Sequence, residues 1–490
     1  MNREAIRFIL GWILNVEGAL LLLPTLVAAI YRESCGWTFA ATVLLCLAIG
    51  IPCTWGGLRQ KVFHTREGLV IVALSWLVLS IVGAIPFVLS GAIPHPVDAL
   101  FETVSGFTTT GASILTDVES LPRSILFWRS FTHWIGGMGI LVFILSILPL
   151  SGGYHMHLMK AESPGPEVSK LAPRVQSTAK ILYGIYLVLT AVEVVLLLLG
   201  NMPLFDALTT TFGTAGTGGF GIKNDSITSY SPYIQYVVTI FMILFGVNFN
   251  AYFLILMGRA KQLRYAEEVW TYLGIIAASV AVIAFNTYRI YQNVEETFRH
   301  AAFQVASIIT TTGFATTDFD QWPQLSRTIL VILMFIGACA GSTGGGIKVS
   351  RLLILVKSIR MEFHYFLHPR EVRCLRLEGH AVSSDTIRSV NVFLITYMMV
   401  FVVSTLLVSL DNQDLVTNFT AVAATLNNIG PGLAAVGPTQ NFSHFSVFSK
   451  LVLTFDMLAG RLELFPVLLI FFPRTWKRFS KKNLTGPGPG

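Results

Sequence analysis

The chain has 490 residues, of which 53% are hydrophobic and only 12% are charged, and its mean hydropathy is +0.66. A soluble protein carries about 25% charged residues, so this composition excludes a soluble globular protein and indicates a bundle of membrane-spanning helices surrounded by lipid. The net charge of +7 does not indicate nucleic-acid binding, because the lysines and arginines fall in short clusters between apolar runs and form no single basic face.

The first apolar stretch, Ile6 to Tyr31, predicts a retained helix. It is longer than the ~15 residues of a signal-peptide core, and no small-residue cleavage site follows it. A second apolar run near residues 37–57 would pair with it as an N-terminal hairpin.

Further apolar runs are long enough to cross a bilayer, which takes about 20 residues. They lie near residues 69–92, 124–150, 181–200, 232–258, 269–291, 325–357, 389–410 and 445–473. With the hairpin this predicts ten spans, so both termini lie on one side of the membrane. The basic clusters between spans identify that side as cytoplasmic by the positive-inside rule.

Four of the intervals between spans contain a short segment that ends in threonine and glycine. The segment from Val97 to Thr108 would be roughly 18 Å long as a helix, too short for a hydrocarbon core of about 30 Å. We therefore expect half-helices that enter the membrane and turn back. Each unit of span, half-helix, turn and span begins and ends in the cytoplasm, so the copies are parallel. This favours a pore over the inverted repeats of many solute transporters.

An internal repeat supports the half-helices. Residues 101–111 read FETVSGFTTTG and residues 303–313 read FQVASIITTTG, while weaker copies occupy residues 208–218 (LTTTFGTAGTG) and 420–430 (TAVAATLNNIG). The predicted fold is an all-α polytopic membrane protein with four parallel helix–pore-loop–helix repeats in pseudo-fourfold arrangement, plus the N-terminal hairpin. The predicted boundaries are 1–67 for the hairpin and 68–177, 178–266, 267–388 and 389–490 for the repeats.

The glycine turns predict a cation filter. Non-helical backbone at membrane depth is tolerated only where it is buried in protein or lines water. Backbone carbonyls can replace the hydration shell of a monovalent cation, glycine allows the required backbone angles, and each half-helix directs its negative end toward the ion. The predicted potassium-binding residues are Thr109, Thr110, Gly111, Gly216, Thr217, Gly218, Thr311, Thr312, Gly313, Asn428, Ile429 and Gly430. Gly219 follows Gly218, and the sequence does not decide between them; Gly218 is chosen by register.

The span at 325–357 would be about 50 Å long if straight, so we expect it to break. Gly341, Ser342, Thr343, Gly344, Gly345 and Gly346, with Lys348, then form a gate beneath the filter or, alternatively, a plain hinge. A phosphate-binding loop is excluded because Ile347 separates Gly346 from Lys348.

Arg461 lies between two apolar runs, where an ionisable group is costly and usually functional. We expect it to face the cavity as part of the gate and to pair with a loop carbonyl or Glu463; snorkelling or a structural ion pair is the alternative. The run Gly136-Gly137-Met138-Gly139 indicates helix packing. His133 has no catalytic partner at a suitable spacing, so we expect no enzyme.

The motifs TTTGA, GTGGFG, TTTGFATTDFD, NNIGPGL, ACAGSTGGGIKVSR and AGRLELFP resemble the Trk/Ktr/HKT superfamily of potassium transporters. The resemblance covers nearly the whole chain, and the additional N-terminal hairpin makes it closest to the membrane subunit of the bacterial Trk system. It implies potassium uptake across the bacterial inner membrane through a single-chain pore without a cofactor of its own. It also implies a homodimer and a cytosolic regulatory subunit of the TrkA type that binds NAD or ATP/ADP. Whether transport is channel-like or coupled to protons or sodium stays open.

Overall fold

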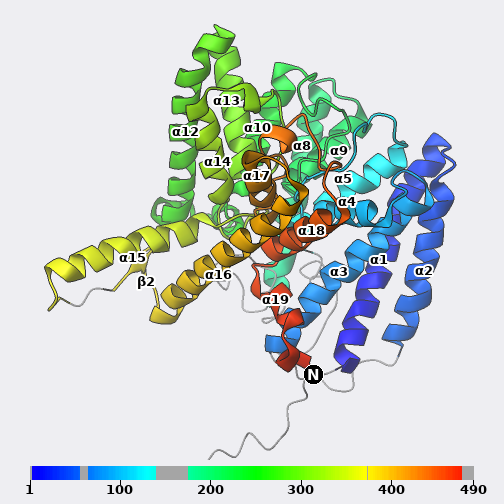
Figure 1. The fold of residues 1–490 in the computed structure, drawn as a ribbon, viewed down its shortest axis with the longest axis horizontal. Helices are drawn as coiled ribbons and strands as arrows, with labels where there is room; N and C mark the ends of the chain where they lie inside the picture. The colour runs from blue at the N-terminus through cyan, green and yellow to red at the C-terminus, as the bar shows by residue number, and fades with distance from the viewer. Residues whose placement is uncertain (1–2, 56–64, 140–174, 372–373, 477–490) are drawn as a thin grey trace, which may run out of the picture.

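The structure is a computed structural model that describes residues 3–55, 65–139, 175–371 and 374–476. Helices make up most of this part of the chain (Figure 1). The strands among the described residues are a two-stranded antiparallel hairpin, β1 (Arg376–Leu377) and β2 (His380–Ala381). The all-α prediction is therefore confirmed.

The N-terminal helices α1 (Arg3–Tyr31) and α2 (Gly36–Thr54) lie side by side at one edge of the bundle, with α1 next to α3 (Figure 1). Small residues allow the pair to pack closely, as is common between membrane helices. A Cβ added to Gly50 would lie less than 3.0 Å from the Gly11 carbonyl, so neither position has room for a side chain.

Four repeats follow, and each contains the same three kinds of helix. The long first helices are α3 (Thr65–Leu89), α8 (Val175–Leu199), α12 (Glu267–Tyr291) and α16 (Ser384–Val408). The half-helices are α4 (Pro96–Phe107), α9 (Leu204–Ala215), α13 (Val294–Ile309) and α17 (Leu415–Leu426). The second helices begin as α5 (Arg123–Met138), α10 (Pro232–Gly246), α14 (Gln324–Phe335) and α18 (Val447–Arg461). The repeat boundaries predicted from the sequence stay predictions.

Within the described parts of the chain, six helices are long and apolar enough to cross a membrane: the hairpin pair and the first helix of every repeat. The corresponding predicted spans are confirmed. The half-helices are buried on almost every side in the middle of the bundle, as residues 101–107 of α4 illustrate. Their N-termini are capped by prolines or polar side chains. The Asp414 carboxylate, for example, accepts from the Thr417 amide and so satisfies a free backbone donor of α17.

The second helices are interrupted, and the sequence predicted this for the third repeat alone. There the helix stops at Phe335 and resumes as α15 (Val349–Leu367). In repeat two the chain turns by 90° between α10 and α11 (Phe249–Leu256), and in repeat four it breaks before α19 (Phe465–Phe471). The sequence predicted spans at 232–258 and 445–473 without a break, and the structure interrupts both; Pro232–Gly246 and Phe249–Leu256 together are still long and apolar enough for one broken span. In repeat one α5 ends at Met138, and residues 140–150 of the predicted span 124–150 lie outside the described residues.

The remaining described elements are short 3-10 turns. They are η1 (Ala260–Tyr265), η2 (Phe319–Gln321), η3 (Ser409–Asp411), η4 (Ala434–Val436) and η5 (Pro473–Trp476).

Candidate functional site

The four half-helices end in the same turn. The second residue after each helix has a left-handed backbone: Thr109 (φ 54°), Thr217 (φ 53°), Thr311 (φ 58°) and Asn428 (φ 57°). The next amide then donates to the carbonyl five residues earlier, at 2.8 Å in every copy. This is the Schellman motif, which normally places glycine or asparagine in the left-handed position. A β-branched threonine there is unusual, and three such residues at one level mark a functional site.

A glycine with positive φ follows two residues later in each turn. These glycines are Gly111 (φ 79°), Gly219 (φ 76°), Gly313 (φ 87°) and Gly430 (φ 96°). The geometry therefore corrects the register of the second repeat by one residue, to Thr217, Gly218 and Gly219 in place of Gly216, Thr217 and Gly218. The sequence left this open because two glycines are adjacent and the position of the helix end at Ala215 was not known.

The four turns form a closed ring. A Cβ added to Gly111 would lie less than 3.0 Å from the Gly218 carbonyl oxygen of the next repeat. The same relation joins Gly219 to Thr312, Gly313 to Ile429 and Gly430 back to Thr110. Each glycine thus makes room for the carbonyl that precedes the glycine of the following repeat. We call the carbonyls of Thr110, Gly218, Thr312 and Ile429 the ring carbonyls.

Threonine and asparagine side chains support the ring from outside. The Thr110 hydroxyl bonds to Thr108 at 2.8 Å and accepts from the Asn428 amide at 2.9 Å. Asn428 also donates to the Met457 carbonyl at 2.9 Å. Asn428, the fourth repeat's replacement for threonine, therefore ties repeat four to repeat one. The side chains of Thr108, Thr110 and Asn428 therefore form one hydrogen-bonded group beside the first and fourth turns.

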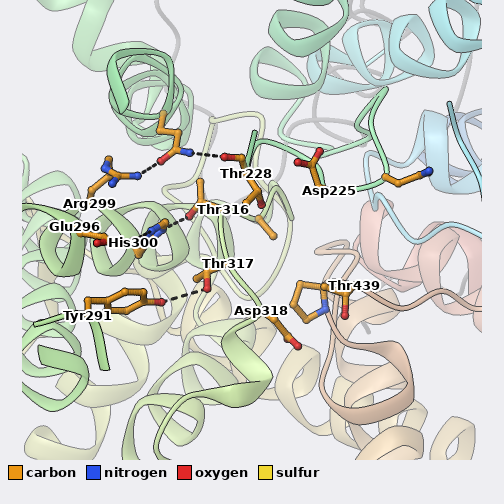
Figure 2. A pocket seen from close by; sticks show the side chains of 14 residues that line it. Asp225, Thr228, Tyr291, Glu296, Arg299, His300, Thr316, Thr317, Asp318 and Thr439 are labelled. Atoms are coloured by element: carbon orange, nitrogen blue, oxygen red, sulfur yellow. Dashed lines mark hydrogen bonds and ion pairs between the residues drawn. The ribbon is translucent and has the colours of Figure 1, made fainter. Parts of the chain in front are cut away.

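A cavity of about 200 Å³ lies on one side of the ring, and all four left-handed glycines line it. We call it the vestibule. A neighbouring pocket of about 570 Å³ carries Asp225, Glu296 and Asp318, and in Figure 2 these side chains come from different segments around one opening. Asn224 and Thr439 line both spaces, so the pocket adjoins the vestibule and places carboxylates beside it.

A buried ion pair fixes the vestibule wall. The Arg129 guanidinium donates to the Glu102 carboxylate at 2.6 Å, and both side chains are almost fully buried. Glu102 also accepts from the Ile114 amide at 3.0 Å, and Arg129 donates to the Gly221 carbonyl at 2.8 Å. The pair therefore holds in place the two non-helical segments that follow the first and second turns, at Ile114 and Gly221. Sequence reasoning missed it, although charges within apolar segments were the available signal.

Removing one partner should be costly, because it leaves an uncompensated buried charge. We expect Glu102→Ala to lower the free energy of unfolding by about 3–5 kcal/mol. Glu295→Ala breaks the more exposed Glu295–Arg299 pair and should cost less than about 1 kcal/mol. Thermal unfolding of the two purified variants in detergent compares them. Equal melting temperatures would show that the buried pair does not stabilise the fold.

The segment 336–348 between α14 and α15 lies against the ring on the side opposite the vestibule. The Gly345 amide donates to the Thr311 hydroxyl at 2.6 Å. Added Cβ atoms on Gly344 and Gly345 would come within about 3 Å of the Thr310 and Asn427 carbonyls respectively. We call this segment the inner loop; it contacts repeats three and four where their half-helices end.

Hydrogen bonds join the two ends of the inner loop to each other and join the loop to neighbouring helices. The Gly337 amide donates to the Ile347 carbonyl at 2.8 Å, and the Lys348 ammonium donates to the carbonyls of Gly344 and Gly345. The Glu268 carboxylate accepts from the amides of Ala340 (2.7 Å) and Ser350 (2.9 Å). The other predicted gate positions also belong to the loop: Gly341 accepts from the Phe249 amide, and Ser342 donates to the Cys339 carbonyl.

Arg461 joins the inner loop to repeat one. Its guanidinium donates to the Thr343 carbonyl at 2.8 Å, to the Gly137 carbonyl at 2.8 Å, and to the Gly136 carbonyl. The expected loop-carbonyl partner is therefore present, while Glu463 accepts from Arg351 at 2.6 Å. Gly136 and Gly137 do pack closely, against Phe107 and Gly216, but they also end a helix and supply these acceptors.

These contacts predict that Arg461 holds the inner loop in place. Arg461→Ala should raise cation flux, since it removes both the loop contact and a positive charge beside the pathway. At about 6 Å and an effective dielectric near 20, one unit charge opposes another by roughly 2.8 kcal/mol, and water reduces this considerably. Arg461→Lys should change flux less. Liposome flux per folded protein decides the matter, and an alanine variant that conducts no better than arginine would make the residue purely structural.

His133 packs against Gly218 of the second turn. Its Nδ1 is 2.7 Å from the Gly106 carbonyl, and its ring packs against Phe220. The expectation of a polar residue satisfied by its neighbours is therefore met at Nδ1 alone, because the buried Nε2 has no hydrogen-bond partner among the described residues.

Comparison with known proteins agrees with this geometry. The profile of the family described as "TrkH: Cation transport protein" matches residues 37–478. The Trk system potassium uptake protein TrkH of Salmonella typhimurium is 39% identical over 484 residues, which cover 97% of this chain and all of that protein. TrkG of Escherichia coli is 32% identical at 97% and 100% coverage.

Among solved structures, the crystal structure of the potassium transporter TrkH from Vibrio parahaemolyticus matches with a TM-score of 0.88 and 34% identity. The match covers 97% of this chain and 100% of that one. The shared fold, the length of the match and the level of identity agree with one another. This multi-pass membrane protein therefore belongs to the TrkH family of cation transport proteins and is not an enzyme.

Proposed function

We propose that the chain takes up potassium, which passes through the ring of four glycine turns. The observation that carries the proposal is ring closure: each left-handed glycine makes room for the carbonyl of the next repeat, in the order one, two, three, four and back to one. Four carbonyls around one axis can replace the hydration shell of a monovalent cation. Four half-helices end at the ring, and their negative ends favour a cation there.

Potassium is the proposed cation because of the ligand type and the relatives. Neutral carbonyl oxygens suit a weakly hydrated monovalent ion, and the relatives from Salmonella typhimurium and Escherichia coli carry the name potassium uptake protein. The filter then consists of Thr109, Thr110, Gly111, Thr217, Gly218, Gly219, Thr311, Thr312, Gly313, Asn428, Ile429 and Gly430.

The inner loop is the proposed gate. Its Gly345 amide bonds directly to Thr311 at the base of the filter, so an ion cannot leave on this side while the contact persists. Lys348 and Arg461 bond to carbonyls of the loop and keep it folded. Movement of α15, which begins directly after the loop, would displace it.

The orientation and the partners are part of the proposal. Lys261 and Arg264 in η1 and Lys357 in α15 make the inner-loop side the cytoplasmic side by the positive-inside rule, with both termini there. Within the bacterial inner membrane we propose a homodimer. We also propose a cytosolic nucleotide-binding subunit that acts on these basic segments, as the resemblance to the Trk system implies.

Flux into liposomes tests the function. Purified protein should pass rubidium and potassium down a gradient and largely exclude sodium, without an accompanying proton or sodium flux. Proton or sodium movement in fixed ratio to potassium would instead establish the alternative, a coupled symporter. Absence of potassium and rubidium flux in folded, correctly oriented protein would contradict the proposal.

A further inference from the structure

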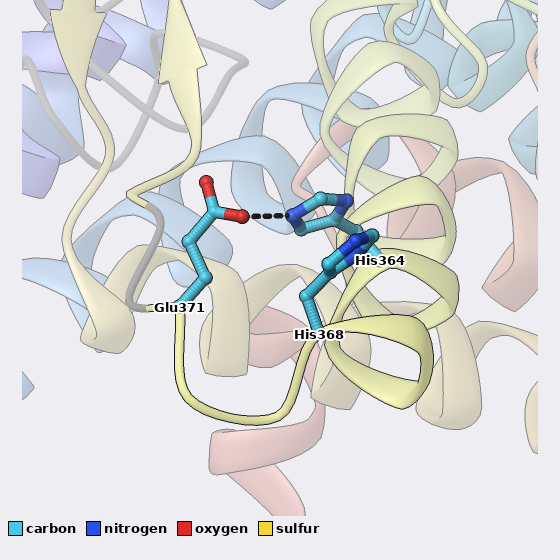
Figure 3. A group of neighbouring side chains, drawn as sticks. All are labelled: His364, His368 and Glu371. Carbon is cyan, nitrogen blue, oxygen red and sulfur yellow. Dashed lines mark hydrogen bonds and ion pairs between the residues drawn. The ribbon is translucent and has the colours of Figure 1, made fainter.

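Helix α15 ends in a cluster of two histidines and a glutamate. His364 lies in the last turn of α15, and His368 is the residue that caps the helix after Leu367, with its amide still donating to the His364 carbonyl at 2.8 Å. Glu371 lies three residues further along the chain. Their potential ligand atoms all lie within 4.8 Å of one another. Figure 3 shows the three side chains converging on one point, with the Glu371 carboxylate directed at His364.

Details of the geometry match a metal site better than a surface ion pair. His364 Nε2 is 2.8 Å from the Glu371 carboxylate, and the two imidazole rings are stacked with centroids 4.7 Å apart. An exposed pair of this kind contributes less than about 1 kcal/mol and gives His368 no role. A shared metal ion uses all three groups.

We propose that His364, His368 and Glu371 bind one zinc ion. Zinc takes imidazole nitrogen and carboxylate oxygen at about 2.0–2.2 Å, and two histidines four residues apart at a helix end, with a nearby glutamate, satisfy this preference. Ligands around a tetrahedral ion at these bond lengths are about 3–3.5 Å apart, so modest side-chain rotations close the site. The fourth position remains for water. Magnesium and calcium prefer oxygen ligands and do not suit the cluster.

The zinc site is connected to the proposed gate through α15, and this part of the inference rests on the proposed function. α15 begins at Val349, whose amide donates to Ala338 in the inner loop, so the loop and the zinc site are the two ends of one helix. Lys357 of α15 bonds to Glu267 and to the Arg376 carbonyl. These bonds attach α15 to α12 and to the β1–β2 hairpin. Zinc fixes the end of α15 that lies away from the inner loop, and this restrains the movement of α15 that would displace the loop. Zinc therefore favours the state with the inner loop on the ring and lowers flux.

Calorimetry of the full chain, purified without a histidine tag and stripped with a chelator, tests the site. Zinc chloride should bind with one ion per chain, and excess magnesium should not compete. His364→Ala, His368→Ala and Glu371→Ala should each weaken binding by about tenfold or more, since even loss of an outer-shell partner has an effect of that size. His380→Ala is the matched control, because His380 is an exposed histidine on the nearby hairpin outside the cluster. It should bind zinc like the wild type.

Two results would overturn the site: no zinc binding by the wild type, or equal binding by the cluster variants and His380→Ala. Liposome flux tests the link to the gate. Zinc should lower rubidium flux in the wild type and in His380→Ala but not in His368→Ala, and equal flux with and without zinc would remove the link. A protein that passes no potassium would contradict the proposed function, while calorimetry would still decide the metal site.

Discussion

Gly313→Ala and Gly111→Ala should each lower the potassium-to-sodium permeability ratio by about tenfold or more. Either substitution places a methyl group against a ring carbonyl of the next repeat, and the left-handed backbone disfavours any side chain. Backbone strain of this kind costs about 1–3 kcal/mol, and 1.4 kcal/mol corresponds to a factor of ten in an equilibrium. Gly111→Ser should have the same effect. Bi-ionic flux in liposomes measures the ratio.

Gly184→Ala and Gly274→Ala are matched controls, because an added Cβ at these positions on the long helices α8 and α12 meets no described atom within 4 Å beyond the local backbone of its own helix. Both should keep the wild-type ratio. Gly219→Ala should behave like Gly313→Ala, which tests the corrected register of the second turn. Unchanged ratios in Gly111→Ala and Gly313→Ala would remove these turns from the filter.

Deletion of Gly344 to Gly346 should raise basal flux severalfold in the absence of any partner. The deletion removes the amide that bonds to Thr311, the glycines that fit against the half-helix ends, and both carbonyls that accept from Lys348. Gly345→Ala should act in the same direction more weakly, since its methyl group cannot fit against the Asn427 carbonyl. Initial rates of rubidium uptake into liposomes, per folded protein, give the comparison.

Size-exclusion profiles and melting temperatures identify the folded fraction of each variant. A folded deletion variant with wild-type flux would mean that the inner loop is a hinge and not a barrier.

The glycine turns were predictable because the chain repeats them. Each copy alone resembles an ordinary helix end. Four copies, each between two spans, indicate four re-entrant turns, and such turns are stable in a membrane only where they meet in the protein interior or line water. The Schellman geometry also explains why Asn428 can replace threonine, since asparagine tolerates the left-handed conformation. What the repeat left uncertain was its register where glycines are adjacent, as at Gly218 and Gly219.

The helix breaks in repeats two and four were not predictable from hydropathy. The stretches before and after Val247 and Leu462 are predominantly apolar, so each interrupted helix looks like one span by hydropathy, although Gly246 and Asn248 flank Val247 and Arg461 and Glu463 flank Leu462. Partners distant in sequence satisfy the backbone groups exposed at the breaks. Gly246 accepts from the Cys339 amide, and Gly137 accepts from Arg461, 324 residues away. Such pairings follow from the tertiary arrangement and have no local signal.

The central claim is that four carbonyls coordinate the transported ion. Anomalous diffraction from crystals grown in rubidium or thallium, both of which substitute for potassium, tests it most directly. The account predicts a peak on the axis between the carbonyl oxygens of Thr110, Gly218, Thr312 and Ile429. The absence of a peak at that position, with anomalous density in the vestibule alone, would contradict it.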